Sequence, residues 1–225
     1  MKEKYISIAI DGPAAAGKST IAKGVADILG FTYVDTGAMY RAYTYYVLQR
    51  QVNPQDEVAV SRLKDEVNID LNADGTILLN GEDVTKAIRL SDINQNVSYI
   101  ASYKEVRLHL VAEQQKLAEN KSVVMDGRDI GTYVLPNADV KIFLVADVKT
   151  RAIRRHEENL QKGITSKLEQ IEKELKRRDE IDSGRAFAPL KKADDAVYLD
   201  SSSLNIEQVI AGVLEIINEK IGLEV

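Results

Sequence analysis

The chain has 225 residues and no cysteine, which excludes disulfides and cysteine-based metal sites and leaves enough length to bury a sizeable core. Its net charge is −5, yet residues 149–192 hold 13 basic and 8 acidic side chains, so this segment alone is positive. An acidic chain with one basic segment argues against general nucleic-acid binding and favours a local anion site, although a solvated helical face of mixed charge would have the same composition.

The first apolar run, residues 5–10, is far too short to cross a membrane and lacks a signal-peptide cleavage pattern. The two histidines, His109 and His156, match no ligand spacing, so we expect both to be ordinary helix residues. The sequence therefore predicts a cytoplasmic protein with neither a membrane nor a nucleic acid as a partner. No long heptad repeat indicates an oligomer, so a monomer is expected.

Strand-like and helical segments alternate along the chain, which predicts an α/β fold with a central parallel sheet flanked by helices. Strands are expected at residues 5–10, 32–34, 122–125, 140–146 and 197–199. Helices are expected at residues 19–29, 38–49, 103–120, 150–178 with a break near Gly163, and 206–221.

Residues 66–80 interrupt this alternation. Two short β-like runs, 68–71 and 76–79, are joined through Asp74-Gly75 and followed by Asn80-Gly81. Asp-Gly and Asn-Gly are strong short-range hairpin signals. The sequence therefore predicts a small antiparallel insertion, followed by a helical stretch that reaches about residue 98.

An eight-residue run between the first strand and the first helix fits the pattern G-x-x-x-x-G-K-[ST] at every fixed position. Its glycines allow the backbone to turn tightly around one phosphate, and the following helix adds the positive end of its dipole. Lys18 would reach the β- and γ-phosphates, and the hydroxyl of Ser19 would bind Mg²⁺. The expected nucleotide-binding residues of this loop are Gly12, Pro13, Ala14, Ala15, Ala16, Gly17, Lys18, Ser19 and Thr20.

Such a loop is compatible with a small-molecule kinase, a GTPase switch or an ATPase motor. GTPases usually carry Asn-Lys-x-Asp, whereas residues 120–123 read Asn-Lys-Ser-Val and lead directly into a strand. Motor ATPases usually carry an acidic catalytic residue after a second acidic strand, which residues 145–147 imitate weakly. Because neither alternative explains the basic segment, the kinase is favoured.

Two polar clusters follow strand ends, where ligands bind in open α/β sheets. The first spans Asp35 to Arg41 and opens a helix, so its hydroxyl and its arginine could hold an acceptor phosphate. The second spans Asp126 to Asp129. Taken alone, the first could be a helix cap with a surface arginine, and the second a turn stabilised by an ion pair.

Two further clusters lie in the basic segment. Arg151, Arg154 and Arg155 have the spacing of one helix face, and arginine suits bidentate phosphate recognition. Arg178, with Asp182 and Arg185, lies at the far end of the same stretch. Phosphoryl transfer needs this kind of charge, and an acceptor that is itself an ionised phosphate needs no general base.

Together these residues resemble one family, the bacterial cytidylate kinases. The resemblance runs from Ile8 to about Ile217, which is nearly the whole chain. It rests on the loop at 12–19, on Asp-Thr-Gly-x-x-Tyr-Arg, Asp-Gly-Arg-Asp-x-Gly-Thr and Arg-Asp-x-x-Asp-x-x-Arg, and on the Ala-Pro-Leu that follows. The Asp-Gly-Arg-Asp-x-Gly-Thr run combined with a hairpin-bearing insertion separates this family from adenylate and guanylate kinases.

The resemblance implies a single P-loop kinase domain, 1–225, that transfers the γ-phosphoryl group of ATP, with Mg²⁺, to CMP or dCMP. Its core would comprise 1–35, 103–148 and 194–225. The monophosphate-binding region, with the insertion, would comprise 36–102, and a lid with basic helices 149–193.

The resemblance also implies the site. The CMP phosphate would be held by Thr36, Arg41 and Arg128, with Tyr40 alongside, and cytosine would be read by Ser98, Arg107 and Asp129. The ribose would meet Asp182, with Arg178 and Arg185 nearby. Arg151, Arg154 and Arg155 would belong to the lid over ATP, and the expected catalytic residues are Lys18, Arg128, Arg155 and Arg178. Thr36 replaces a serine of some members but keeps the hydroxyl.

Two other functions stay open. A kinase for another metabolite would need a group that activates a hydroxyl, and Asp35 is the only candidate with suitable placement. A non-catalytic regulator would bind nucleotide without acceptor-dependent turnover. From the residues alone, Asp129 and Arg107 could equally form a structural ion pair.

Overall fold

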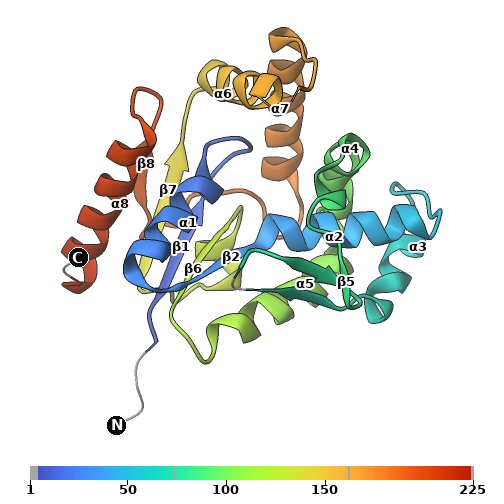
Figure 1. Ribbon diagram of the computed structural model, residues 1–225. Coiled ribbons are helices and arrows are strands. Elements are labelled where there is room, and N and C mark those ends of the chain that lie inside the picture. The colour runs from blue at the N-terminus through green and yellow to red at the C-terminus, as the bar shows by residue number, and fades with distance from the viewer. Residues whose placement is uncertain (1–4, 73, 162, 224–225) are drawn as a thin grey trace.

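Five parallel strands form the central sheet of the computed structural model, which describes residues 5–72, 74–161 and 163–223 (Figure 1). Their order across the sheet is β2-β6-β1-β7-β8, and every neighbouring pair is parallel. The strands are β1 (Ser7–Asp11), β2 (Thr32–Asp35), β6 (Val123–Gly127), β7 (Val140–Val145) and β8 (Val197–Asp200). The predicted α/β fold is confirmed, and each predicted strand is present within two residues of its expected bounds.

The central strands are nearly continuous apolar runs because helices cover both faces of the sheet. On one face, α1 (Lys18–Leu29) and α8 (Ile206–Ile221) pack on a cluster that includes Ile8, Ile10 and Leu144. On the other face, α5 (Lys104–Ala118) covers Val123 and Met125. This double cover buries both faces of the central strands.

The strand register brings the carboxyl ends of the central strands to one edge. Asp126 of β6 pairs with Ile10 of β1 and Asp35 of β2, and Asp11 pairs with Gly127. The loop after β1, the loop after β6 and the start of α2 (Thr36–Gln49) therefore leave the sheet side by side. The polar clusters predicted at strand ends are brought together by this register.

The predicted insertion is present as a separate antiparallel sheet that packs with α2 and α5. It has three strands, one more than predicted, because Asn80 and Gly81 adopt the positive φ angles of a two-residue hairpin turn. Ala73, in the other predicted turn, lies outside the described residues. The strands are β3 (Ile69–Leu71), β4 (Ile77–Leu79) and β5 (Glu82–Asp83).

Short helices surround this small sheet. The sequence prediction missed α3 (Glu57–Arg62), because six residues are too few to show a helical period; Asp56 caps it by accepting the Ala59 N–H. The predicted helical stretch up to residue 98 consists of a single turn, η2 (Ala87–Arg89), and α4 (Ser91–Ile100). The remaining short turns are η1 (Leu63–Glu66) and η3 (Ile130–Val134).

The basic segment forms two helices, α6 (Val148–Gln161) and α7 (Leu168–Gly184), above the carboxyl edge of the sheet (Figure 1). The predicted break falls between them, where Gly163 has a φ of 70°. Their apolar residues Ala152, Ile171 and Leu175 pack on Ala14. No helix in the described part of the chain is long and apolar enough to cross a membrane.

Leu144→Ala is expected to lower the free energy of unfolding by about 2–5 kcal/mol, because it removes buried contacts and leaves a cavity in the core that β7 forms with α1 and α8. Leu160→Ala is the matched control, since Leu160 is 58% exposed on α6; it should change stability by about 0.5 kcal/mol or less. Urea unfolding of the two variants measures the difference, and equal effects would contradict this core.

Candidate active site

The loop between β1 and α1 is shaped by close backbone contacts. A Cβ atom on Gly12 would lie 1.9 Å from the carbonyl oxygen of Leu144, so only glycine fits between β1 and β7. Gly17, with a φ of 88°, caps α1. The Lys18 amine folds back on the loop and donates to the carbonyl of Pro13 at 2.8 Å. The loop thus brings a buried amine to the N-terminal end of α1, where the positive end of the helix dipole favours phosphate binding.

Asp126, at the end of β6, links this loop to the neighbouring strand and helix. Its Oδ2 accepts a hydrogen bond from Ser19 Oγ at 3.1 Å, and its Oδ1 accepts one from the Tyr33 hydroxyl at 2.8 Å. Its backbone carbonyl accepts the hydroxyl of Thr36 at 2.7 Å. Burial raises the pKa of the Asp126 carboxyl, and burial with the nearby charge of Arg128 lowers the pKa of Lys18.

Asp126 was singled out in the sequence as part of a strand-end cluster, but no role was predicted for it. The signal was present, because an acidic residue directly after an apolar strand lies at the edge where ligands bind. Asp11, a second such residue, was missed entirely. Its two oxygens accept the N–H groups of Ile130 and Gly131, each at 2.8 Å, and burial raises its pKa to about 7.

The structure brings Arg107 and Asp129 into a buried ion pair. Arg107 is 1% exposed, and its guanidinium donates to Asp129 Oδ2 at 2.5 Å and to the carbonyl of Ala101 at 2.9 Å. The Tyr40 ring lies beneath the same guanidinium, 5.3 Å from its carbon atom. Ser98, also expected here, is buried on α4.

A second carboxylate, Asp182 of α7, is buried between two arginines. Arg128 donates to its Oδ2 at 2.8 Å, and Arg185 donates to its Oδ1. Burial alone would raise the pKa of Asp182, but the two guanidinium groups outweigh burial and lower it. Arg128, which follows β6, thus meets Asp182 and Arg185 at the end of α7.

Four arginines, here termed the arginine cluster, interact around Asp182: Arg41 of α2, Arg155 of α6, Arg178 of α7 and Arg128, which follows β6. Burial and then repulsion from Arg128, Arg41 and Arg155 lower the pKa of Arg178 to about 10. Burial also lowers the pKa of Arg41, to which Arg128 and Arg155 contribute. Positive charges that repel one another in this way favour the binding of anions between them.

The three arginines of α6 do not act together. Arg151 is buried against the loop, where it donates to the carbonyls of Ala146 and Ala14 and pairs with Asp179 at 2.7 Å. Arg154 turns away and donates to backbone carbonyls after β8. Only Arg155 joins the arginine cluster. The three side chains thus contact different neighbours, because α6 packs between the loop, the segment after β8 and the arginine cluster; their role over ATP stays a prediction.

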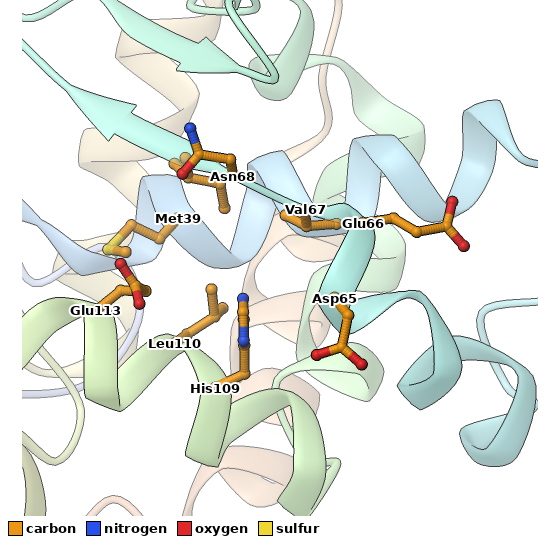
Figure 2. Close-up of a pocket in the computed structure, with 9 residues that line it drawn as sticks. Met39, Asp65, Glu66, Val67, Asn68, His109, Leu110 and Glu113 are labelled. Carbon is orange, nitrogen blue, oxygen red and sulfur yellow. The ribbon is translucent and has the colours of Figure 1, made fainter.

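A hollow of about 300 Å³ lies elsewhere, between α2, α5 and the segment 65–69, and Figure 2 shows side chains that line it. None of the predicted site residues lines it, and its carboxylates Glu66 and Glu113 are already paired with Arg50 and Lys116. An open hollow of about 500 Å³ instead borders Arg185, beside the buried Asp182. The second hollow adjoins the site described here.

Comparison with known proteins identifies the family. A family model described as cytidylate kinase matches residues 8–219, which is most of the chain. The chain belongs to the cytidylate kinase family. The resemblance read from the sequence is confirmed.

Relatives of this cytidylate kinase family member match over almost their whole length. The cytidylate kinase of Anoxybacillus flavithermus is 52% identical over 222 residues, which cover 97% of this chain and 99% of that protein. The cytidylate kinase of Geobacillus sp. (strain WCH70) is 54% identical over 220 residues, 96% of this chain and 98% of that protein.

Solved structures at low identity agree on the fold of this family member. An uncharacterized protein from Eubacterium ventriosum superimposes with a TM-score of 0.54 at 14% identity, covering 96% of this chain and 99% of that one. A gluconokinase from Sinorhizobium meliloti reaches 0.50 at 11% identity, with coverage of 95% and 92%. These likenesses concern the fold, which is the P-loop kinase fold.

Asp129→Asn is expected to lower the free energy of unfolding by about 3–5 kcal/mol, because it leaves the Arg107 charge buried without its counter-ion. Glu113→Gln removes the same kind of charge from an exposed pair with Lys116 and should cost about 1 kcal/mol or less. Denaturant unfolding distinguishes them, and a small effect of Asp129→Asn would show that the Arg107 pair is not buried.

Proposed function

We propose that this protein transfers the γ-phosphoryl group of ATP to CMP or dCMP, giving ADP and CDP or dCDP. The observation that carries the proposal is the arginine cluster, which gathers positive charge from three helices and the loop after β6, and whose member Arg128 also acts on Lys18. Two anionic substrates must be held close together for this reaction, and their mutual repulsion needs such compensation. Membership of the cytidylate kinase family supports the same activity.

On the donor side, ATP would bind the loop 12–19 and Thr20, with Lys18 placed on the transferring group. Arg155 and Arg178 would stabilise charge on that group, and we propose Lys18, Arg128, Arg155 and Arg178 as catalytic. Arg151 and Arg154 were predicted to contact ATP. The hydrogen bond from Arg151 to the Ala14 carbonyl supports a different contribution for Arg151, which is to fix the loop that binds ATP.

Mg²⁺ would be held by Ser19 and Asp126, whose oxygens lie 3.1 Å apart at the loop. Hydroxyl and carboxylate oxygens are the hard ligands that Mg²⁺ prefers, so the donor set fits. Among the described residues, no group of three or more acidic or histidine side chains is placed to hold a metal ion. Mg²⁺ usually takes its remaining ligands from substrate phosphates and water, and bound there it neutralises charge on the phosphates.

On the acceptor side, Thr36, Arg41 and Arg128 would hold the CMP phosphate. The buried Arg107–Asp129 pair, with Ser98, would read the base, because cytosine presents one donor amine beside acceptor atoms. The pair offers the complement, a carboxylate that accepts and a guanidinium that donates. Tyr40 would support Arg107, and Asp182 with Arg185 would meet the ribose.

These groups explain the reaction without a general base. The acceptor phosphate is already ionised near neutral pH, so the protein must position it and stabilise the charge that develops during transfer. Closure of a lid formed by 149–193 over a core and a monophosphate-binding region would exclude water, the competing acceptor. We also propose a cytoplasmic monomer, on the basis of composition alone.

The proposal predicts turnover that depends on a pyrimidine acceptor. ADP release from Mg²⁺·ATP should be well above background with CMP and dCMP, and near background with AMP, shikimate or no acceptor. A coupled assay across this panel, with UMP included, measures it. Turnover with AMP would overturn the base assignment, and ATP binding without acceptor-dependent turnover would favour a regulator.

Arg41→Ala should raise the KM for CMP by about ten- to a hundred-fold while leaving the KM for ATP nearly unchanged, because one charge-assisted contact to the acceptor phosphate is lost. Arg62→Ala, on the exposed face of α3, is the control and should change neither constant. Steady-state kinetics with each substrate varied in turn would show whether the loss is confined to the acceptor. An unchanged KM for CMP contradicts the phosphate assignment.

A further inference from the structure

The side chain of Tyr33 joins the apolar core to the proposed metal ligand. Tyr33 lies on β2, and its ring packs with the cluster that α1 forms on the sheet. The register of β2 with β6 places Tyr33 opposite Val124, two residues before Asp126 and on the same face of the sheet. The ring is thus anchored in the core, and its polar end reaches the carboxyl edge.

The hydroxyl of Tyr33 occupies one of the two oxygens of Asp126. It donates to Oδ1 at 2.8 Å, while Ser19 Oγ donates to Oδ2 at 3.1 Å. With one donor on each oxygen, the carboxylate of Asp126 is held against rotation about its Cβ–Cγ bond. The oxygen directed at Ser19, where the metal is proposed to bind, is fixed as a consequence.

A tyrosine suits this task better than a second charged group would. Its hydroxyl donates a hydrogen bond without adding a positive charge that would compete with a cation for the same carboxylate. Partners of this kind orient the ligands of a metal and typically change its affinity by about 10–100-fold when they are removed. Nothing in the sequence pattern assigns a role to Tyr33, because a tyrosine in a strand is an ordinary core residue.

We propose that Tyr33 is a positioning residue for Asp126, and that its hydroxyl strengthens the binding of the nucleotide together with Mg²⁺ rather than the binding of the nucleotide alone. This inference rests on the proposed metal site at Ser19 and Asp126. The hydrogen bond from Tyr33 to Asp126 could orient the carboxylate for the metal, or it could serve only to hold β2 against β6. Metal-dependent nucleotide affinity distinguishes these two roles.

Tyr33→Phe removes the hydroxyl and keeps the ring. The affinity for ADP would be measured by titration calorimetry in Mg²⁺ and again in EDTA, and the ratio of the two affinities is the quantity compared. The ratio should fall by about tenfold in the variant, while the affinity in EDTA stays within about twofold of the wild type. The Mg²⁺ concentration for half-maximal turnover should rise in parallel.

Tyr43→Phe is the matched control, because the buried hydroxyl of Tyr43 donates to the carbonyl of Val60 at 2.9 Å, far along the chain from the loop. It should lower the melting temperature without changing the ratio. A Tyr33→Phe protein that behaves in the same way would overturn the inference while leaving the metal site intact. If Mg²⁺ gives the wild type no gain in ADP affinity, the metal assignment itself fails, and the role of Tyr33 fails with it.

Discussion

The organisation of the site depends on one buried carboxylate, Asp126, at the end of a central strand. Its two side-chain oxygens and its backbone carbonyl accept hydrogen bonds from Ser19, Tyr33 and Thr36. These three donors come from α1, β2 and α2, so the proposed donor and acceptor halves share a single anchoring residue. A buried carboxylate without partners would be costly, and the hydrogen bonds that offset this cost also set the spacing of the halves.

Near this carboxylate lie the positively charged side chains of the arginine cluster, which repel one another. Burial and then repulsion from Arg128, Arg41 and Arg155 lower the pKa of Arg178, and this repulsion within the cluster favours the binding of anions. Asp182 neutralises part of this charge through its ion pair with Arg128. The region where buried like charges repel one another is therefore the region proposed to bind substrates, as is common at functional sites.

Local sequence patterns were sufficient for the architecture and for the nucleotide loop, because both depend on residues close together in the chain. The strands, the main helices and the loop 12–19 follow from period and spacing. The hydrogen bonds that Asp11 accepts from Ile130 and Gly131 join positions more than a hundred residues apart, and no short-range sequence pattern predicts them. Helix α3 was too short to detect.

The contacts of long side chains were the second feature that the sequence could not predict. Spacing placed Arg151, Arg154 and Arg155 on one face of a helix, but it could not say what lay opposite each. Arg151 meets the loop, Arg154 meets the turn after β8, and Arg155 meets the arginine cluster, because α6 lies between three different neighbours. The roles of individual residues in the site, including the pairing of Tyr33 with Asp126, likewise depend on tertiary packing.

Gly12 carries a consequence for how such sequences diverge. Its missing side chain lets β1 approach β7, where a Cβ atom would lie 1.9 Å from the Leu144 carbonyl oxygen. A descendant that lost catalysis but kept the sheet would therefore remain under selection to keep this glycine. Within the loop, Gly12 is required by the packing of the strands, whereas Lys18, whose amine donates within the loop itself, would show whether the chemistry has been retained.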